Sequence, residues 1–497
     1  MKKLSSLVII ICLLLTSCQL ESGNLSSESN PVSITEGTTE LYTVDINSFT
    51  ETTYTTGVTE PTDISGIPVP EETLTADNSV TASSQKVTSA TSSQVQTTNK
   101  PTSAVRPTVP TTKKPTVPAT QKPTAPTTQP QPSASEMRAI WISCYDYTSA
   151  AGKTRAQYKA VTDKMFRTIK SNGLNTAFVH LRANSDAFYK SSIFPYSVYI
   201  AGKEGASLPF DPFEVLLESA AANGISVHGW INPFRVSTQN KVAALSATNP
   251  AKIILDSGNA DGRVCVLSNG IYYNPADTEN HKLILDGVKE IISKYNIDGI
   301  HIDDYFYPST DASIDKTQYN TYRQSGGTLT LAKWRVANIN AFVSALYSTV
   351  KATDSSLVVS ISPSGQLDKT LRENSADCRT WLSHKGYADM IIPQIYFGFN
   401  HQTEDFNKLL KQWASLPRHS SVRLVCGIAA YKCAKADNYA GSGKTEWQNS
   451  TDILARQITA IRSNKNYSGF AVFSYADLER AACKTEIENM KKTISAN

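Results

Sequence analysis

The chain has 497 residues, a formal net charge of +4 and 19 % charged residues. This length is too great for one ordinary hydrophobic core, so it requires either a large α/β barrel or several domains. Because positive and negative charges nearly balance, the sequence does not indicate nucleic acid as a partner.

Residues 1–18 have the features of a bacterial export signal. Lys2 and Lys3 precede an apolar run from Leu7 to Leu15, which is too short to span a bilayer comfortably. The run ends in Leu-Thr-Ser-Cys, which resembles the bacterial lipobox, with Cys18 as the residue that would carry lipid. We therefore expect a lipid anchor on the extracytoplasmic face of a bacterial membrane, in the cell wall zone. An ordinary cleaved signal is the alternative.

Residues 19–135 form a long segment dominated by Thr, Ser, Pro and Gln. It has too few large apolar residues to offset the entropy lost on ordering, so we expect disorder. Proline-rich chains are extended, at about 3.1 Å per residue. The segment therefore suits a linker that holds a domain away from a membrane.

Strand-like and helix-like segments alternate from residue 136 to residue 497. Strands are predicted at Arg138–Ser143, Ala177–Leu181, Ser226–Ile231, Gly299–Asp303, Leu357–Ser362, Met390–Tyr396, Leu424–Ala429 and Phe470–Tyr475. Helices are predicted at Tyr158–Ser171, Phe213–Ala222, Leu283–Tyr295, Leu331–Val350, Glu404–Ser415, Ile453–Arg462 and Lys484–Thr493. Eight strands alternating with helices is the pattern of a (β/α)8 TIM barrel, an α/β fold. A doubly wound open sheet is the rival, although no Gly-x-Gly-x-x-Gly motif follows an early strand.

An acidic and aromatic motif closes the fourth predicted strand, and it reads Asp298-Gly-Ile-His-Ile-Asp-Asp-Tyr-Phe-Tyr-Pro308. Alternation places His301 and Asp303 on the face opposite Ile300 and Ile302. If the isoleucines pack on helices, the aspartate faces the middle of a sheet or barrel. Two acids beside three aromatic rings are costly to bury, whereas a site that cleaves sugars needs carboxylates and flat rings. A helix cap or a buried ion pair is the alternative interpretation.

The third and sixth predicted strands show the same division between two faces. His228, Trp230 and Asn232 oppose Val227 and Ile231, while Gln394 and Tyr396 oppose Ile391 and Ile395. A purely structural barrel would fill its interior with Val, Ile and Leu, so this polar and aromatic face favours a site. Enzymes built on barrels place their chemistry at the carboxyl ends of the strands.

These motifs together resemble the glycosyl hydrolase-like family 10, found in bacterial envelope lipoproteins. The matching blocks occur in order across residues 137–400: Arg138-Ala-Ile-Trp-Ile-Ser143, Asn175-Thr-Ala-Phe-Val-His-Leu-Arg182, Asp186-Ala-Phe-Tyr189, Asp211-Pro-Phe213, His228-Gly-Trp-Ile-Asn-Pro-Phe-Arg235, Tyr273-Asn-Pro275, the motif at 298–308, Ser360-Ile-Ser-Pro363 and Pro393-Gln-Ile-Tyr396. The resemblance implies a (β/α)8 barrel that acts on glycosidic bonds, with cell-envelope glycan as the expected substrate. Peptide-free peptidoglycan glycan is one candidate.

Three positions depart from the family pattern. His180 and Ala183 stand where the family more often has Gln and Pro, and Ser364 stands where an aromatic or similar residue is expected. These changes touch the predicted wall of the site and leave the acidic motif intact. A chitinase pattern would need Glu at the position of Tyr305, so a chitinase mechanism is disfavoured.

Glycoside hydrolysis usually needs two carboxyl groups. Our first hypothesis makes Asp303 the nucleophile or base, and Asp304 the acid or a ligand for a sugar hydroxyl. Asp146, Asp186 and Asp477 are other candidates for the second group, and the last two are also candidates for helix caps.

Further residues near strand ends are expected to contact substrate. The polar ones read as ligands for sugar hydroxyl, amide or carboxylate groups, the aromatic ones as stacking surfaces, and the histidine either tunes Asp303 or is an interior residue. They are Arg182, Asn184, Asp186, Trp230, Asn232, Arg235, Asn274, His301, Tyr305, Gln394, Tyr396 and Tyr431, with Trp141 and Tyr307 as additional stacking candidates.

Six cysteines remain beyond the signal, and fifteen pairings are open among them: Cys144, Cys265, Cys378, Cys426, Cys433 and Cys483. None has the paired spacing of a structural zinc site, so we expect no metal and no cofactor. The rival functions are a wall-glycan binding protein without catalysis and a metal-dependent deacetylase. The latter needs a His/Asp cluster, and no His-x-x-x-His spacing occurs.

Overall fold

A computed structural model describes residues 136–259 and 261–496. The predicted signal at residues 1–18, its lipidation site Cys18 and the predicted linker at residues 19–135 lie outside the described residues. Within the part of the chain that the structure describes, no helix is both long and apolar enough to cross a membrane.

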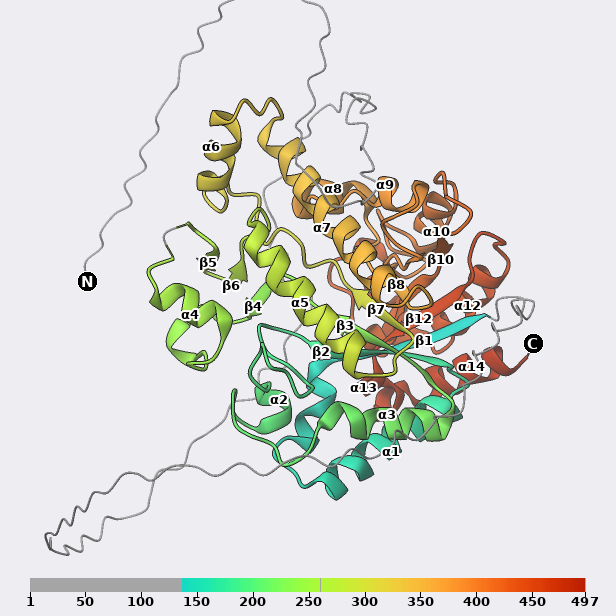
Figure 1. The fold of residues 1–497 in the computed structure, drawn as a ribbon. Helices are drawn as coiled ribbons and strands as arrows, with labels where there is room; N and C mark the ends of the chain where they lie inside the picture. Colours follow the sequence, from blue (N-terminus) through green and yellow to red (C-terminus); the bar gives the residue numbers. More distant parts are fainter. Residues whose placement is uncertain (1–135, 260, 497) are drawn as a thin grey trace, which may run out of the picture. The chain divides into compact units, whose positions relative to one another are not determined.

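The described residues form a closed barrel of parallel strands (Figure 1). The strand order is β10-β9-β8-β7-β3-β2-β1-β12-β11. The strands are β1 (Met137–Ile142), β2 (Thr176–Arg182), β3 (Ser226–Ile231), β7 (Gly299–Ile302), β8 (Val358–Ile361), β9 (Met390–Ile391), β10 (Arg423–Leu424), β11 (Cys426–Ala429) and β12 (Gly469–Phe473).

Strands β10 and β11 act as one strand and close the ring. Only Val425 separates them, and its N–H donates to the carbonyl of Ile391 at 3.0 Å. The N–H of Gly427 donates to the carbonyl of Pro393 at 2.9 Å, while β11 also pairs with β12. The barrel therefore has eight strands, and the predicted (β/α)8 fold is confirmed.

Helices surround the barrel and connect its strands (Figure 1). The longer ones are α1 (Arg155–Ser171), α3 (Pro212–Asn223), α5 (Thr278–Lys294), α6 (Lys316–Gln324), α7 (Leu331–Thr353), α8 (Leu367–Asn374), α10 (Phe406–Ala414), α12 (Ile453–Arg462) and α14 (Lys484–Ser495). Shorter helices are α2 (Val198–Ala201), α4 (Pro250–Asp256), α9 (Cys378–Ser383), α11 (Glu446–Asn449) and α13 (Tyr475–Leu478). Turns of 3-10 helix include η2 (Cys144–Ala150), η3 (Val242–Ala244), η4 (Ala430–Lys432), η5 (Gly441–Gly443) and η6 (Ala481–Cys483).

Local signals explain where several helices begin and end. Asp211 accepts a hydrogen bond from the N–H of Phe213 at 3.0 Å, and Pro212 occupies the first turn of α3, where its missing N–H costs nothing. The same helix ends at Gly224, whose φ of 62° is a left-handed conformation that glycine adopts without a steric penalty. These two caps set the first and last residues of α3, after which the chain enters β3.

A second, antiparallel sheet interrupts the connection between β3 and α5. It contains β4 (Arg235–Ser237), β5 (Val264–Leu267) and β6 (Gly270–Tyr273) in the order β4-β6-β5. In Figure 1 these strands lie together with α4 at the edge of the barrel. The sequence had not predicted this sheet, and its first residue, Arg235, reaches the site described below.

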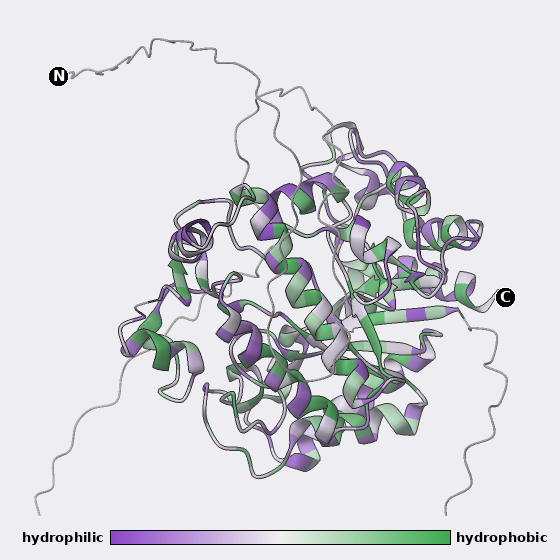
Figure 2. Cartoon of the chain, turned by 45° about the horizontal axis from the view of Figure 1, so that its top comes forward, coloured by the Kyte–Doolittle hydropathy of each residue, from purple (hydrophilic) through white to green (hydrophobic). Residues whose placement is uncertain are grey.

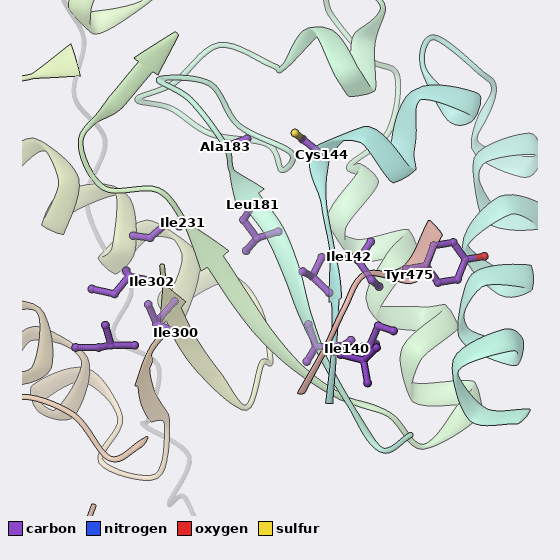
Figure 3. Close-up of a cluster of buried hydrophobic side chains, with 14 of the residues drawn as sticks. Ile140, Ile142, Cys144, Leu181, Ala183, Ile231, Ile300, Ile302 and Tyr475 are labelled. Carbon is purple, nitrogen blue, oxygen red and sulfur yellow. The ribbon is translucent and has the colours of Figure 1, made fainter. Parts of the chain in front are cut away.

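The barrel strands separate two hydrophobic layers. Ile140, Ile142, Ile300 and Ile302 belong to the large outer layer between strands and helices, part of which is drawn in Figure 3. Figure 2 shows the mainly hydrophobic strands enclosed by helices with hydrophilic residues on their outward turns. A fully buried isoleucine stabilises the fold by about 1.5–3 kcal/mol, so this layer supplies much of the driving force for folding.

The inner layer is smaller and has a different composition. Trp230 packs inside the barrel, whereas Val227 and Ile231 belong to the outer layer, so the division predicted for the third strand is confirmed. The inner cluster comprises Met137, Ala139, Trp141, Phe178, Trp230, Met390, Ile392, Val425 and Ala471. It is apolar towards the amino ends of the strands, and polar residues follow towards the carboxyl ends.

Candidate active site

A buried polar layer crosses the barrel below its carboxyl end. Trp141 donates from Nε1 to Nε2 of His301 at 3.0 Å, and Nδ1 of His301 lies 2.8 Å from Oγ of Ser360. Since Nε2 accepts this bond, the imidazole proton is on Nδ1 and the ring is neutral. Burial lowers the pKa of His301 well below its usual range, and its ring stacks on Phe178 with centroids 4.2 Å apart. These contacts make His301 an interior support for the residues above it.

Asp303 occupies the next inward position after His301 and is 3 % exposed. Its Oδ2 accepts a hydrogen bond from Nε1 of Trp230 at 3.2 Å, and its Oδ1 accepts one from the N–H of Tyr305 at 3.3 Å. Burial and the neighbouring charge of Asp304 raise the pKa of Asp303 to about 8. This carboxyl group therefore holds a proton near neutral pH.

Trp230 is itself held by a stacked histidine. Its ring lies parallel to His180 with centroids 3.6 Å apart, and Nδ1 of His180 accepts a hydrogen bond from the N–H of Cys144 at 3.2 Å. His180 is 2 % exposed, and burial lowers its pKa well below the usual range. One of the departures from the family pattern thus supports the tryptophan that contacts Asp303.

Asp304 is the more solvated member of the pair. It is half-buried, and its Oδ1 accepts a hydrogen bond from Nε2 of Gln394 at 3.3 Å. The same amide nitrogen also donates to the carbonyl of Ser362 at 2.8 Å, which fixes its direction. Burial raises the pKa of Asp304 as well. Because water reaches Asp304 more easily than Asp303, Asp304 is the first of the two to ionise.

Arg235 supplies positive charge beside the two carboxyl groups. It comes from β4 in the inserted sheet, donates from Nε to the carbonyl of Ala183 at 3.0 Å, and places its guanidinium 4.5 Å from the ring centroid of Tyr305. Its charge opposes the effect of burial and lowers the pKa of both Asp303 and Asp304. With this opposing charge, one carboxyl group of the pair ionises while the other keeps its proton.

Three half-buried aromatic rings adjoin this end of the barrel, and we call them the aromatic wall: Tyr396, Tyr431 and Phe473. The ring of Tyr396 lies 5.8 Å from that of Tyr431 and 5.8 Å from that of Phe473. The rings of Tyr396 and Trp141 meet edge to face, with their centroids 6.5 Å apart. Phe473 was missed by the sequence reasoning, although it is the last residue of β12 and alternates with inward Ala471.

Several predicted contact residues anchor loops in this structure. Arg182 is 2 % exposed and donates from Nη2 to the carbonyls of Asn232 and Pro233 at 3.0 and 2.7 Å. Asn232 donates to the carbonyl of Ala183 at 3.1 Å. Asn274 donates to the carbonyls of Gly262 and Ile314 at 3.0 and 3.2 Å. These bonds stabilise the strand-to-helix connections around the site.

Asp186 and Asn184 lie in the loop after β2. Asp186 accepts a hydrogen bond from the N–H of Asn184 at 3.2 Å, and burial raises the pKa of Asp186 to about 6. Asn184 remains half-buried. Tyr307, a further stacking candidate, is 1 % exposed and packs under the guanidinium of Arg335, 5.0 Å from its ring centroid.

Asp146 and Asp477, which we call the capping pair, lie after β1 and β12. Asp146 accepts from the N–H and hydroxyl of Ser143 at 2.7 and 2.9 Å. Asp477 accepts from the N–H and hydroxyl of Ser474, both at 3.3 Å, and from Nε of Arg480 at 3.0 Å. Both residues complete capping boxes. Burial raises the pKa of Asp146 to about 6.

Tyr145 is an exposed aromatic residue that the sequence reasoning also missed. It directly precedes Asp146, is 45 % exposed and meets Tyr199 edge-on with centroids 5.5 Å apart. The positive charge of Arg235 lowers its pKa, against the larger opposing effect of burial. A large aromatic residue just after a barrel strand was the signal that could have identified it.

Within the described residues, no group of three or more His, Cys, Asp and Glu side chains has an arrangement that could hold a metal ion. The arrangement around Asp303 offers a neutral carboxyl group, a second carboxyl group that ionises more easily, an arginine and several aromatic faces. Proton transfer to and from an uncharged polar substrate is the chemistry that these groups can perform.

Comparison with known proteins identifies relatives over most of the described chain. The sequence profile of the family described as Glycosyl hydrolase-like 10 matches residues 136–442. The chain is 29 % identical over 370 residues to glycosyl hydrolase YngK of Bacillus subtilis (strain 168), with 70 % of each chain covered. It is 30 % identical over 337 residues to glycosyl hydrolase DigH of Escherichia coli (strain K12), with 61 % of this chain and 75 % of the relative covered. The profile and these relatives support a glycosidase-type function.

Solved structures with lower similarity were also found. Alpha-L-fucosidase isoenzyme 2 from Paenibacillus thiaminolyticus aligns with a TM-score of 0.46 and 12 % identity, covering 72 % of this chain and 48 % of the fucosidase. The chain thus spans about half the length of that protein. The β-mannanase from the blue mussel Mytilus edulis aligns with a TM-score of 0.38 and 14 % identity, covering 72 % of this chain and 90 % of the mannanase.

Proposed function

This chain belongs to the glycosyl hydrolase-like 10 family, and on that basis we propose that its barrel hydrolyses glycosidic bonds of a polysaccharide in the bacterial cell envelope. The observation that carries the proposal is the Asp303–Asp304 pair at the carboxyl end of β7. A buried acid that keeps its proton near neutral pH, next to a carboxyl group that ionises more easily, is the combination that glycoside hydrolysis requires.

In the proposed mechanism Asp303 is the general acid. Its pKa of about 8 keeps the proton available for the glycosidic oxygen as the bond to the leaving sugar breaks. This assignment reverses the roles that strand alternation alone suggested, because the deeper burial of Asp303 favours its neutral form.

Asp304 is the ionised partner in this mechanism. It acts either as the nucleophile at the anomeric carbon or as the base that activates water. Arg235 stabilises the negative charge on the pair, and Gln394 directs the Asp304 carboxylate through its 3.3 Å hydrogen bond. The aromatic wall and Tyr305 offer flat faces to pyranose rings.

Envelope polysaccharide is the proposed substrate because of the predicted position of the protein. The apolar run and the lipobox-like sequence ending at Cys18 favour a lipid anchor on the outer face of the membrane. The linker at residues 19–135 would then carry the barrel into the cell wall zone. Mass spectrometry of the mature amino terminus tests this step: a lipid-modified Cys18 is expected, and an unmodified chain cleaved elsewhere would contradict it.

The hydrolase proposal is tested on defined glycans, including peptide-free peptidoglycan strands. The chain is incubated with each glycan and the products are identified by mass spectrometry, with the Asp303→Asn variant as the matched control. New reducing ends from the wild-type chain alone are expected. Binding to glycan without new reducing ends, even at high protein concentration, would contradict hydrolysis and support a glycan-binding function instead.

A further inference from the structure

Two cysteines from different connections meet beside the aromatic wall. Cys433 follows η4, the turn after β11, and Cys483 ends η6, the turn after α13. They are 2 % and 0 % exposed, and they are 50 residues apart in sequence. The carboxyl ends of β11 and β12 are neighbours in the barrel, so their following turns lie side by side.

Arg480 joins the same two segments through the backbone. Its Nη2 donates to the carbonyls of Tyr431 and Cys433 at 3.2 and 2.9 Å, and its Nε donates to Asp477 at 3.0 Å. These hydrogen bonds therefore hold the turn that carries Cys483 next to the turn that carries Cys433. A contact fixed in this way recurs each time the chain folds.

The Cys483 thiol lies against Cys433. Their interaction raises the pKa of Cys433 and lowers that of Cys483. The Cys483 thiol also lies 3.9 Å from the carbonyl oxygen of Cys433, which accepts its hydrogen bond.

Three of the other cysteines donate from their thiols to backbone carbonyls of residues other than cysteine. Cys265 donates to the carbonyl of Ile314 at 3.6 Å, Cys378 to that of Ala376 at 3.7 Å, and Cys426 to that of Gly427 at 3.8 Å. Of the pairings that the sequence left open, the structure brings this one together.

We propose that Cys433 and Cys483 form a disulfide bond when the chain folds in an oxidising medium. The reaction is a thiol–disulfide exchange with a small-molecule or protein disulfide as the oxidant. One cysteine thiolate attacks the oxidant to give a mixed disulfide and releases one oxidant thiol. The second cysteine then displaces the other oxidant thiol. The two cysteines lose two protons and two electrons, and the oxidant disulfide is reduced to two thiols.

The bond ties together two turns at the carboxyl end of the barrel. It closes a loop that contains α11, α12 and β12, and it fixes the segment Ala430–Cys433, which carries Tyr431 of the aromatic wall. Because both sulfurs are buried, exchange takes place during folding, and the folded protein then shields the bond from reductants. The inference is independent of glycosidase activity.

Disulfide mapping of the full chain tests the proposal. The chain is refolded with a mixture of reduced and oxidised glutathione, free thiols are blocked with N-ethylmaleimide, and a non-reducing digest is analysed by mass spectrometry. The expected result is one linked peptide pair containing Cys433 and Cys483, with the remaining cysteines alkylated. Alkylation of both Cys433 and Cys483, or a link from either to a different cysteine, would overturn the proposal.

Matched variants separate the bond from general effects of cysteine removal. Cys433→Ala should leave Cys483 alkylated, whereas Cys378→Ala, also at a buried position, should retain the linked pair. Reduction under mild denaturation should lower the Tm of the wild-type chain by roughly 5 °C, as expected for a loop of this length, and should leave the Tm of Cys433→Ala unchanged. An equal loss of Tm in both chains would count against the bond.

Discussion

Two pairs of aspartates lie just after barrel strands, and the surroundings of the two pairs are very different. In the capping pair, Asp146 and Asp477, each carboxylate receives an N–H and a hydroxyl from a serine three residues earlier. Asp303 of the other pair receives one indole N–H and one backbone N–H, and no salt bridge reaches it within the described residues.

The difference shows that the donors around a carboxylate, more than its place after a strand, decide between structure and chemistry. Burial raises the pKa of Asp146 only to about 6, because hydrogen bonds from Ser143 oppose the effect of burial. Burial and the charge of Asp304 raise the pKa of Asp303 to about 8, and burial raises the pKa of Asp304; Arg235 only partly opposes these effects. A carboxyl group whose proton is easily exchanged is useful in catalysis, whereas one that closes a turn is useful in folding.

The largest expected effect is a difference in kcat between variants of the two aspartate pairs. Asp303→Asn removes the proposed general acid and should lower kcat by roughly 10³-fold, while Asp146→Asn should keep kcat within about threefold. Initial rates on a glycan that the wild-type chain cleaves give both values, and circular dichroism checks the fold. An Asp303→Asn variant with wild-type kcat would remove this residue from the mechanism; a large loss in Asp146→Asn would make the capping pair catalytic.

The second prediction concerns the alkaline limb of the pH profile. Activity should fall as the pH rises through about 8, where Asp303 loses its proton. Arg235 lowers the pKa of this group, so Arg235→Gln should move the limb to higher pH, by about one unit. The profile of kcat/KM between pH 4 and 10 measures the shift, and a limb that stays in place or moves to lower pH would contradict it.

The third prediction is a pH dependence of stability that belongs to the Asp303–Asp304 pair. Since the folded-state pKa of Asp303 is raised, its stabilising contribution is fully present below about pH 4 and is lost as the pH rises through about 8. The Tm of the wild-type chain should therefore fall by a few degrees relative to Asp303→Asn between pH 4 and 9. Calorimetry measures this difference, and a Tm difference that stays constant between pH 4 and 9 would contradict the prediction.

The smallest effect is expected from the capping pair. Asp146→Ala removes the oxygen that accepts both Ser143 hydrogen bonds, and it should reduce the free energy of unfolding by about 1–2 kcal/mol. Urea denaturation measures this loss. A loss near zero would mean that the capping box around η2 contributes little to the fold.

Local periodicity determined much of the fold from the sequence. The alternation of strands and helices predicted the barrel, and the two-residue period of β3 and β7 predicted which side chains face inward, because strand faces depend only on neighbours along the chain. The candidate carboxyl groups followed from the same period. The prediction of a continuous strand to Tyr396 was less accurate: β9 ends at Ile391, and Pro393, which has no N–H to donate, lies just beyond it.

Contacts between distant segments were decided only by the tertiary structure. The inserted sheet brings Arg235 to Tyr305, and β3 supplies the indole N–H that Asp303 accepts, across 73 residues of sequence. The meeting of Cys433 with Cys483 is likewise a result of two strands being neighbours. The pKa of Asp303 depends on burial and on charges from several segments, and the pairing of two thiols depends on the distance between two turns. No local pattern in the sequence encodes these spatial relations.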